Sequence, residues 1–541
     1  MALKKFAIKI DIFMKLNKIK RFFDRINSLD IFLQVFLAGI LAAFAFAPFD
    51  LFFPLVISIS WFYYLFNKSL DFSKKKIFLL GLFYGVGYFL AGVYWVSISL
   101  LVDISQFWWL LPFSITLFPL VLGLFFAFLS LVSHFIFKKF KLEEYQKVLL
   151  FSGFWLIFEL IRGYIFTGFP WNLAGYSMMF NDYAMQSASI FGVYGLSFFA
   201  VLFCLIPILY LVDKKQERVV ANILFVLFVV NLASGIVRLE TAKPEYMGKK
   251  VRLVQGNVEQ NLKWDSQEKY KNFVKHFDIS ESKGFENIDG FIWSETSISY
   301  PIGFYNEIDG KIKNFVDKND QFLISGALKL NLDIYSGKVS KAFNSVFIFS
   351  KDGLKSYNKH HLVPFGEYIP LQKYLPFVKK ITNGSDGFAS GEGPKTLEVA
   401  GIKISPLICY EVIFPYNVVD SGDRPELFVN VTNDAWFGVS SGPYQHLNMS
   451  RMRAVEYGIS MARAANTGVS AYIDPYGRII EKIALNETGF IDVELIRPTN
   501  PTILSHFKFF MLLFILSVMA MLERLYTIII KNPKNENHKK Y

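Results

Sequence analysis

The feature that most constrains this chain is a series of apolar runs, each long enough to cross a lipid bilayer. A helix needs about 20 predominantly apolar residues to span roughly 30 Å of hydrocarbon. Candidate runs cover residues 32–49, 51–66, 77–101, 107–137, 148–166, 188–212, 219–238 and 507–530. The second run is short, and the fifth contains Glu159 and Arg162. We therefore expect a multi-span helical membrane bundle with about eight transmembrane helices.

The composition agrees with a membrane protein. Of the 541 residues, 53% are hydrophobic, and the mean hydropathy is +0.34, which is too apolar for an ordinary soluble protein. The formal net charge of +12 could indicate a nucleic-acid partner, but the Lys and Arg residues lie beside the apolar runs. We therefore expect no nucleic-acid partner and a contact with membrane lipid instead.

Loop charge predicts how the bundle is oriented, because Lys and Arg accumulate in the cytoplasmic loops of membrane proteins. Basic loops follow the second, fourth and sixth runs, with clusters at 74–76, 138–141 and 214–218. The connections around Asp50, around Asp103 and over 167–187 contain no Lys or Arg. Both termini are therefore predicted to lie inside, and the long polar stretch between the last two runs outside.

These runs divide the chain into five predicted parts. They are a basic N-terminal segment (1–30), a seven-helix transmembrane region (31–238), an outer domain (239–501), a C-terminal transmembrane helix (502–530) and a cytoplasmic tail (531–541). In the first part Phe and Ile residues stand among lysines, which suits an amphipathic helix lying on anionic lipid. A partly disordered basic tail is the alternative, and both stay open.

The outer domain has the pattern of α/β layering, in which short β-branched and aromatic runs alternate with charged helical segments. Expected strands cover 251–258, 289–295, 322–330, 344–350, 403–410, 426–433 and 469–474, and expected helices cover 266–278 and 446–464. Two cysteines, Cys204 in an apolar run and Cys409 in this domain, cannot form a disulfide framework. No phosphate loop or zinc-type cysteine pair is visible, so we expect neither a cofactor nor a metal.

Three ionisable residues stand at the ends of apolar strands in this domain. They are Glu295 in FIWSET, Lys359 in YNKHHLVPFGEY and Cys409 in LICYE. Each alone has a structural explanation, since a cysteine in an apolar strand is usually inert core. Glu295 could equally cap the following segment, and Lys359 could be solvated. It is their order and their surroundings that point to a catalytic site.

The order Glu, Lys, Cys and these three contexts resemble the nitrilase superfamily, and VNVTNDAWFG and MARAANTGVS further along are similar to segments of its fold. The resemblance implies an αββα sandwich with Glu295 as general base, Lys359 as oxyanion donor and Cys409 as nucleophile. Such a set is chemically sensible, because a thiol needs a base to remove its proton and a cation to stabilise the developing charge.

Supporting residues follow from the same resemblance. Glu367 would be the accessory glutamate that positions Lys359 or the base, and the backbone amide of Tyr410 would be a second oxyanion donor. Glu411 could line the pocket beside the nucleophile or simply pair with a basic neighbour. Ser294 departs from the family pattern, which usually has proline before the glutamate.

The chain as a whole resembles the apolipoprotein N-acyltransferase family. The segments that carry this likeness are FAFAPFD at 44–50, GYFLAGVYWVSISL at 87–100, TGFPWNLAGYS at 167–177 and VQGNVEQNLKWD at 254–265. In the last of them Trp264 matches a tryptophan that the family needs for activity, although domain packing would explain it equally well.

The family resemblance implies a ping-pong reaction in the bacterial cytoplasmic membrane, with the catalytic domain in the periplasm. A phospholipid would donate an acyl chain to Cys409, and the α-amine of a diacylated apolipoprotein would accept it, which gives a triacylated lipoprotein. Aromatic segments around 167–185 and 363–380 are candidates for lining an apolar cleft between the site and the lipid.

Two other functions remain open on sequence grounds. A membrane-tethered amidase would use the same three residues but pass the acyl group to water. A transporter with an appended binding domain would use intramembrane charge, which Glu159 and Arg162 supply. These two residues lie three positions apart on one helix face and could instead satisfy each other.

Overall fold

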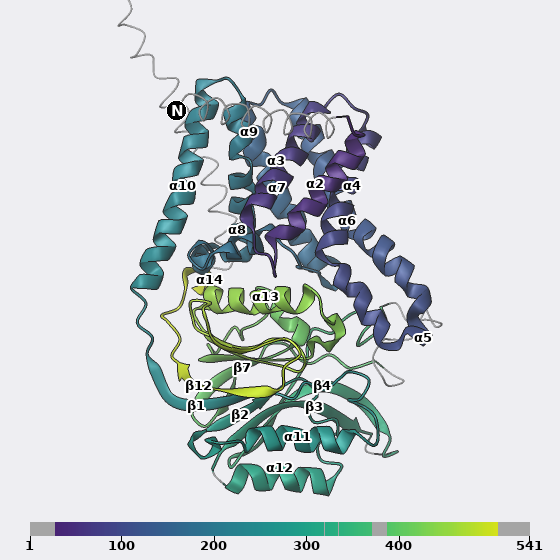
Figure 1. Ribbon diagram of the computed structural model, residues 1–541, viewed down its shortest axis with the longest axis vertical. Coiled ribbons are helices and arrows are strands. Elements are labelled where there is room, and N and C mark those ends of the chain that lie inside the picture. Colours follow the sequence, from purple (N-terminus) through teal and green to yellow (C-terminus); the bar gives the residue numbers. More distant parts are fainter. Residues whose placement is uncertain (1–27, 319, 334, 371–386, 507–541) are drawn as a thin grey trace, which may run out of the picture.

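The computed structural model describes residues 28–506 except 319, 334 and 371–386. A bundle of helices forms the upper part of Figure 1, and a sandwich of two β-sheets lies below it. Most of the predicted basic segment 1–30 lies outside the described residues. The same is true of the predicted span over 507–530 and the tail 531–541.

The helical region is apolar throughout. Its helices are α2 (Ile31–Ala42), α3 (Phe52–Lys68), α4 (Lys74–Gly92), α5 (Ile104–Phe107), α6 (Leu111–Lys139), α7 (Glu144–Tyr164), α8 (Ala188–Cys204), α9 (Ile206–Leu211) and α10 (Lys215–Glu240). Among the described residues, five stretches are long and apolar enough to cross a membrane, namely Lys74–Gly92, Tyr94–Lys139, Glu144–Thr167, Ala184–Leu211 and Lys215–Glu240. The helical membrane region is therefore confirmed, and the number of spans stays a prediction.

Several of the predicted runs are not continuous helices, and two of them show this clearly. The run over 77–101 contains the end of α4 at Gly92 and then a 3-10 segment, Tyr94–Asp103. The run over 188–212 is divided into α8 and α9, with Pro207 in the first turn of α9. Proline lacks an N–H and is best tolerated in a first turn. Hydropathy thus identified the apolar segments but not their breaks.

Close packing of α2 against α4 depends on glycine. A Cβ atom on Gly39 would lie 2.2 Å from the carbonyl oxygen of Tyr84, and one on Gly87 would lie 2.1 Å from that of Phe36. Small residues let helix backbones approach in membranes. A larger side chain at either position would force the two helices apart.

The sandwich consists of two six-stranded sheets, in the orders β12-β1-β2-β3-β4-β5 and β11-β10-β9-β8-β7-β6. The strands of the first sheet are β1 (Tyr246–Gln255), β2 (Gly290–Trp293), β3 (Phe322–Leu332), β4 (Val339–Ser350), β5 (Gly353–Asn358) and β12 (Gly489–Ile496). Those of the second are β6 (Leu397–Val399), β7 (Ile402–Ile408), β8 (Leu427–Thr432), β9 (Ser460–Ala465), β10 (Ser470–Ile473) and β11 (Ile479–Ile483). Buried side chains from both sheets, such as Leu253 and Val429, form one core between them.

Helices cover the outer faces of this sandwich. The helices α11 (Lys269–Ser280) and α12 (Asn306–Lys318) lie below the first sheet in Figure 1, and α13 (Gly442–Tyr457) lies between the second sheet and the bundle. A short helix, α14 (Ile503–His506), follows the last strand. The expected αββα arrangement is therefore confirmed.

The helix predicted over 446–464 is wrong beyond Tyr457. The helix α13 ends there, Gly458 adopts a left-handed conformation with φ of +64°, and Ser460–Ala465 forms β9. The residues SMARAA have a good helix propensity, but all six are buried between β8 and β10. Burial in the sheet overrides propensity here. The strands β5, β6, β11 and β12 were not predicted either.

The helix α13 also joins the two regions. The Oε1 atom of Gln445 accepts hydrogen bonds from the indoles of Trp95 (3.1 Å) and Trp171 (2.7 Å), which belong to connections of the bundle. Asn448 donates to Asp50 in another connection at 3.1 Å. These bonds fix the sandwich against the loops that contain no Lys or Arg.

Candidate active site

Three strand ends deliver the predicted catalytic residues to one buried place. Glu295 follows β2, Lys359 follows β5, and Cys409 follows β7 in the facing sheet. Their exposed fractions are 6%, 1% and 7%. The Nζ atom of Lys359 lies 3.8 Å from Oε1 of Glu295, and both side chains interact electrostatically with the Cys409 thiol.

Lys359 is held chiefly by the predicted accessory glutamate. Its Nζ atom lies 2.9 Å from Oε1 of Glu367, whose Oε2 atom accepts a hydrogen bond from the backbone N–H of Val363 at 2.8 Å. Asn344 donates to Oε1 of Glu295 at 2.7 Å and to Oε1 of Glu367 at 2.9 Å. Asn344 was missed by sequence analysis, because an amide inside a strand gives no motif signal.

The charges of the site favour a protonated thiol beside a protonated lysine. Burial, and after it Glu295, raise the pKa of Cys409 to about 12, with Lys359 opposing. Burial alone would lower the pKa of Lys359, but Glu367 and Glu295 outweigh it and raise that pKa overall. A thiol in this state becomes a nucleophile only if a base takes its proton during attack.

Cys409 has an unusual backbone conformation. Its φ is +50°, in the left-handed region that non-glycine residues rarely adopt, and it begins the 3-10 turn Cys409–Ile413. Its carbonyl oxygen accepts a hydrogen bond from Nε2 of His446 at 3.1 Å. Asp434 lies 2.9 Å from Nδ1 of the same imidazole and 2.6 Å from Arg463. A buried polar chain thus supports the strained turn from behind.

Glu411 connects that turn to residues 359–368, which follow β5 and are called the lysine loop below. Its carboxylate is fully buried and accepts hydrogen bonds from Ile408 N (2.7 Å), His360 N (2.8 Å) and the hydroxyl of Tyr357 (2.9 Å). The Nδ1 atom of His360 lies 2.6 Å from it. Burial would raise the pKa of Glu411, but His360 and the Ile408 N–H outweigh this and lower it.

Tyr410 and Trp264 occupy different surroundings. The hydroxyl of Tyr410 donates to the carbonyl oxygen of Gly168 at 3.0 Å, so its side chain contacts a connection of the membrane region. Trp264 is half-buried, and the ammonium of Lys269 lies 5.9 Å from its ring. Beside it, Lys263 is buried and donates to the carbonyl oxygen of Glu295 at 2.7 Å. Lys263 was not predicted, although it stands next to Trp264 in NLKWD.

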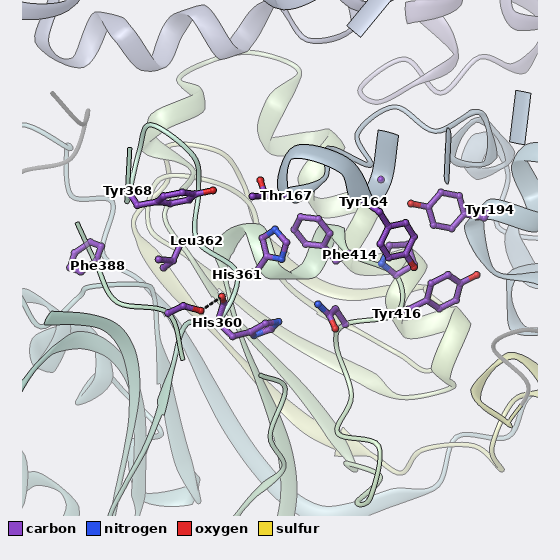
Figure 2. A pocket seen from close by; sticks show the side chains of 14 residues that line it. Tyr164, Thr167, Tyr194, His360, His361, Leu362, Tyr368, Phe388, Phe414 and Tyr416 are labelled. Atoms are coloured by element: carbon purple, nitrogen blue, oxygen red, sulfur yellow. Dashed lines mark hydrogen bonds between the residues drawn. The ribbon is translucent and has the colours of Figure 1, made fainter. Parts of the chain in front are cut away.

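A cavity of about 660 Å³ lies between the membrane region and the lysine loop, and residues of both line it. Figure 2 shows its aromatic walls, in which the ring of His361 stacks on Phe414 at 3.7 Å between centroids. The described residues that line it include His360 but not Glu295, Lys359 or Cys409 themselves. The lining residues are Gly163, Tyr164, Thr167, Tyr194, His360, His361, Leu362, Tyr368, Phe388, Ser390, Phe414, Pro415, Tyr416 and Asn417.

The intramembrane charges Glu159 and Arg162 hold a loop in place. Arg162 donates to the carbonyl oxygens of Phe169 (2.6 Å) and Trp171 (2.7 Å), and Glu159 accepts from the backbone N–H of Ala174 at 2.8 Å. These bonds give both charged side chains a structural role in holding the loop. In the part of the chain that the structure describes, no group of three or more His, Cys, Asp or Glu side chains could hold a metal ion.

Comparison with known proteins covers both regions. Residues 38–233 match the family described as apolipoprotein N-acyltransferase N-terminal domain, and residues 250–499 match the carbon-nitrogen hydrolase family. The apolipoprotein N-acyltransferase of Rickettsia typhi is 38% identical over 88% of this chain and 95% of that protein. Those of Rickettsia prowazekii and Rhizobium rhizogenes are 37% and 35% identical, over 91% and 86% of this chain and 98% and 89% of those proteins.

Among solved structures, a nitrilase-superfamily amidase from Nesterenkonia is 19% identical and covers 47% of this chain and 92% of that chain, with a TM-score of 0.34. The curated relatives extend over the membrane region as well as the sandwich, and they are named as acyltransferases. An amidase tethered to a membrane is therefore not favoured.

Proposed function

The chain belongs to the apolipoprotein N-acyltransferase family, and from this premise we propose that it moves an acyl chain from a phospholipid, through a thioester on Cys409, to a diacylated apolipoprotein. The protein is thus an acyltransferase with a nitrilase-like domain. The proposed acceptor atom is the α-amine of the N-terminal S-diacylglyceryl-cysteine. The observation that carries the proposal is the buried convergence of a thiol, a carboxylate and an ammonium.

In the proposed first half-reaction Glu295 takes the Sγ proton while Cys409 attacks the ester carbonyl carbon of the phospholipid. The electron pair of the carbonyl bond moves to oxygen, where Lys359 and the backbone N–H of Tyr410 stabilise it. Donors of this kind contribute on the order of 3 kcal/mol each. The C–O bond then breaks, Glu295 returns the proton to the departing lysophospholipid, and a thioester remains.

In the proposed second half-reaction the α-amine of the apolipoprotein attacks the thioester carbonyl carbon. Glu295 accepts the proton of the amine, an amide bond forms, and the C–S bond breaks. The leaving thiolate of Cys409 takes back the proton from Glu295. Both half-reactions use the same oxyanion donors, so one site transfers the acyl chain first to Cys409 and then to the α-amine.

We further propose that the sandwich, residues 239–501, faces the periplasm from the bacterial inner membrane, with both termini in the cytoplasm. Two ion pairs show that the basic loops lie close to one another. Lys138 lies 3.3 Å from Asp71, and Lys214 lies 2.7 Å from Glu143. The loops without Lys or Arg contact α13 instead, through Trp171 and Asp50. This segregation agrees with the accumulation of positive charge on the inside.

The cavity gives the proposed lipid substrates a place beside the site. Its volume falls within the usual range for ligand pockets, and Tyr164, Tyr194 and Phe414 give it aromatic walls. We propose that it receives the acyl part of the lipid. Both substrates are anchored in the outer leaflet, so a cavity between the bundle and the lysine loop is suitably located.

Intact-mass analysis of the purified full chain tests the proposed function. Incubation with phospholipid alone is expected to add one acyl chain to Cys409, removable by hydroxylamine. A diacylated lipopeptide is then expected to discharge that chain onto its own α-amine. If product forms from both substrates while no acyl-enzyme is ever detected, direct transfer replaces the thioester mechanism.

A further inference from the structure

A second lysine is buried beside the proposed catalytic residues. Among the described residues, only Lys263 and Lys359 are buried lysines, with exposed fractions of 3% and 1%. Lys263 precedes α11, far in sequence from the lysine loop. Burying an ammonium costs free energy unless the ammonium is paired and hydrogen-bonded. The location of Lys263 therefore calls for an explanation.

The contacts of Lys263 are directed at the base candidate. Its Nζ atom donates to the backbone carbonyl oxygen of Glu295 at 2.7 Å. That carbonyl belongs to the residue immediately after β2 and Ser294, where the chain leaves the sheet. The bond thus fixes the backbone from which the Glu295 carboxylate projects, while Asn344 and Lys359 approach the carboxylate itself.

The charged groups around Lys263 come from three directions. Lys263 interacts electrostatically with Glu295 after β2 in one sheet and with the Cys409 thiol after β7 in the other. It also interacts electrostatically with His276 of α11. Lys359 is a second cation near Glu295, with Nζ 3.8 Å from Oε1, and Asp434 acts electrostatically on Cys409. Burial lowers the pKa of Lys263 to about 8, with Glu295 and Cys409 opposing. At neutral pH the side chain is therefore mostly protonated.

We propose that Lys263 is a positioning residue for the acyl-transfer reaction, which fixes the backbone of Glu295 and places a second positive charge beside the base and the nucleophile. The inference rests on the proposed function of Cys409 and Glu295. A cation near a carboxylate and a thiol favours their ionised forms. Lys263 thus places positive charge beside the carboxylate that accepts the Sγ proton in the proposed reaction.

Three substitutions separate the charge of Lys263 from its hydrogen bond. Lys263→Gln removes the charge but retains an N–H donor, Lys263→Met removes both, and Lys263→Arg retains the charge. Lys271→Gln, at an exposed lysine of α11 that pairs with Glu268, is the matched control. The readout is the rate at which phospholipid alone acylates Cys409, measured by intact mass from pH 5 to 9.

We expect Lys263→Met to lower the acylation rate about 100-fold, and Lys263→Gln about tenfold, as for other buried groups that orient a reacting residue. The acidic limb of the pH profile should move up in Lys263→Gln, because a cation near the base is removed and a nearby cation favours an ionised carboxylate. In Lys263→Arg the acidic limb of the pH profile should lie at the same pH as in the wild type, even if the acylation rate is lower. Lys271→Gln should match the wild type.

Three outcomes overturn the inference. Wild-type rates in Lys263→Gln and Lys263→Met would show that the residue has no role in the reaction. A lower rate with an unmoved acidic limb in Lys263→Gln would indicate a merely structural lysine, and that variant decides if Lys263→Met does not fold. If the wild type itself never acquires an acyl group on Cys409, the proposed function fails first.

Discussion

Lys359 binds Glu367 more closely than it binds Glu295, with Nζ–Oε1 distances of 2.9 and 3.8 Å. The accessory glutamate therefore anchors the ammonium, whereas Glu295 is oriented by the amide of Asn344. This arrangement separates two tasks that one carboxylate could not perform together. Glu367 pairs with the ammonium, and Glu295 is left to exchange a proton with sulfur in the proposed reaction.

Lys359→Arg is expected to lose at least about 100-fold in N-acylation rate although the charge is kept. The broad planar guanidinium cannot replace a compact ammonium between two carboxylates and an oxyanion. The assay is transfer from phospholipid to a diacylated lipopeptide. Lys351→Arg, at an exposed lysine paired with Asp320, is the control. A purified, folded Lys359→Arg enzyme with nearly normal activity would contradict the role of Lys359.

Glu295→Gln is expected to abolish acylation of Cys409 by phospholipid while the fold persists. The amide oxygen can still accept from Asn344, but an amide cannot take the thiol proton. Acyl loading is followed by intact mass, and the melting temperature reports folding. Glu481→Gln, at an exposed strand position, should load like the wild type. Substantial loading of Glu295→Gln would require another base.

The two cysteines provide a matched pair of substitutions. Cys409→Ala should form no acyl-enzyme and no product, whereas Cys409→Ser should trap acyl as a slowly reacting ester, because a hydroxyl is the weaker nucleophile. Cys204→Ala, within α8, should retain transfer because that thiol is only packed. Product from Cys409→Ala would remove the nucleophile from the mechanism.

Glu411→Gln is expected to reduce the free energy of unfolding by about 3 kcal/mol at neutral pH, because it leaves buried donors without a carboxylate. The pKa of Glu411 is lowered in the folded state from 4.5. Its stabilisation is therefore full above the ordinary value and is lost as pH falls through the folded value. Thermal unfolding from pH 3 to 7 should accordingly show a weaker acid dependence in Glu411→Gln. An unchanged pH dependence would indicate that other carboxylates dominate.

The proposed topology predicts the behaviour of reporter fusions. A fusion truncated after residue 245 should be active with a reporter that works only in the periplasm, and one truncated after residue 216 with a cytoplasmic reporter. The two sites flank α10, so they form an internal control. Cytoplasmic activity at the first site would invert the scheme.

Motif context led to the catalytic candidates, because Glu295, Lys359 and Cys409 stand in characteristic order and in segments that resemble one superfamily, although β5 before Lys359 is largely exposed. Asn344 and Lys263 could not be found this way, since their importance arises from partners distant in sequence, an Oε1 atom and a backbone carbonyl. Local pattern does not report such contacts.

The fold shows the same division. Short β-branched and aromatic runs located most of the strands, and long apolar runs located the membrane helices. The helix predicted over 446–464 included most of Ser460–Ala465, yet pairing with β8 and β10 makes that segment β9. The breaks in the apolar runs, such as the one at Gly92, depend on packing between elements.

The burial of α13 limits how this enzyme can be divided. Fourteen of its sixteen residues are buried. Near its N-terminal end, Gln445 accepts hydrogen bonds from the indoles of Trp95 and Trp171. The next residue, His446, donates to the backbone of Cys409. Excising the sandwich as a soluble fragment would expose this helix to water and leave buried polar groups unpaired. The catalytic sandwich is thus not an independent domain attached to a membrane anchor, because contacts with the membrane region complete its packing.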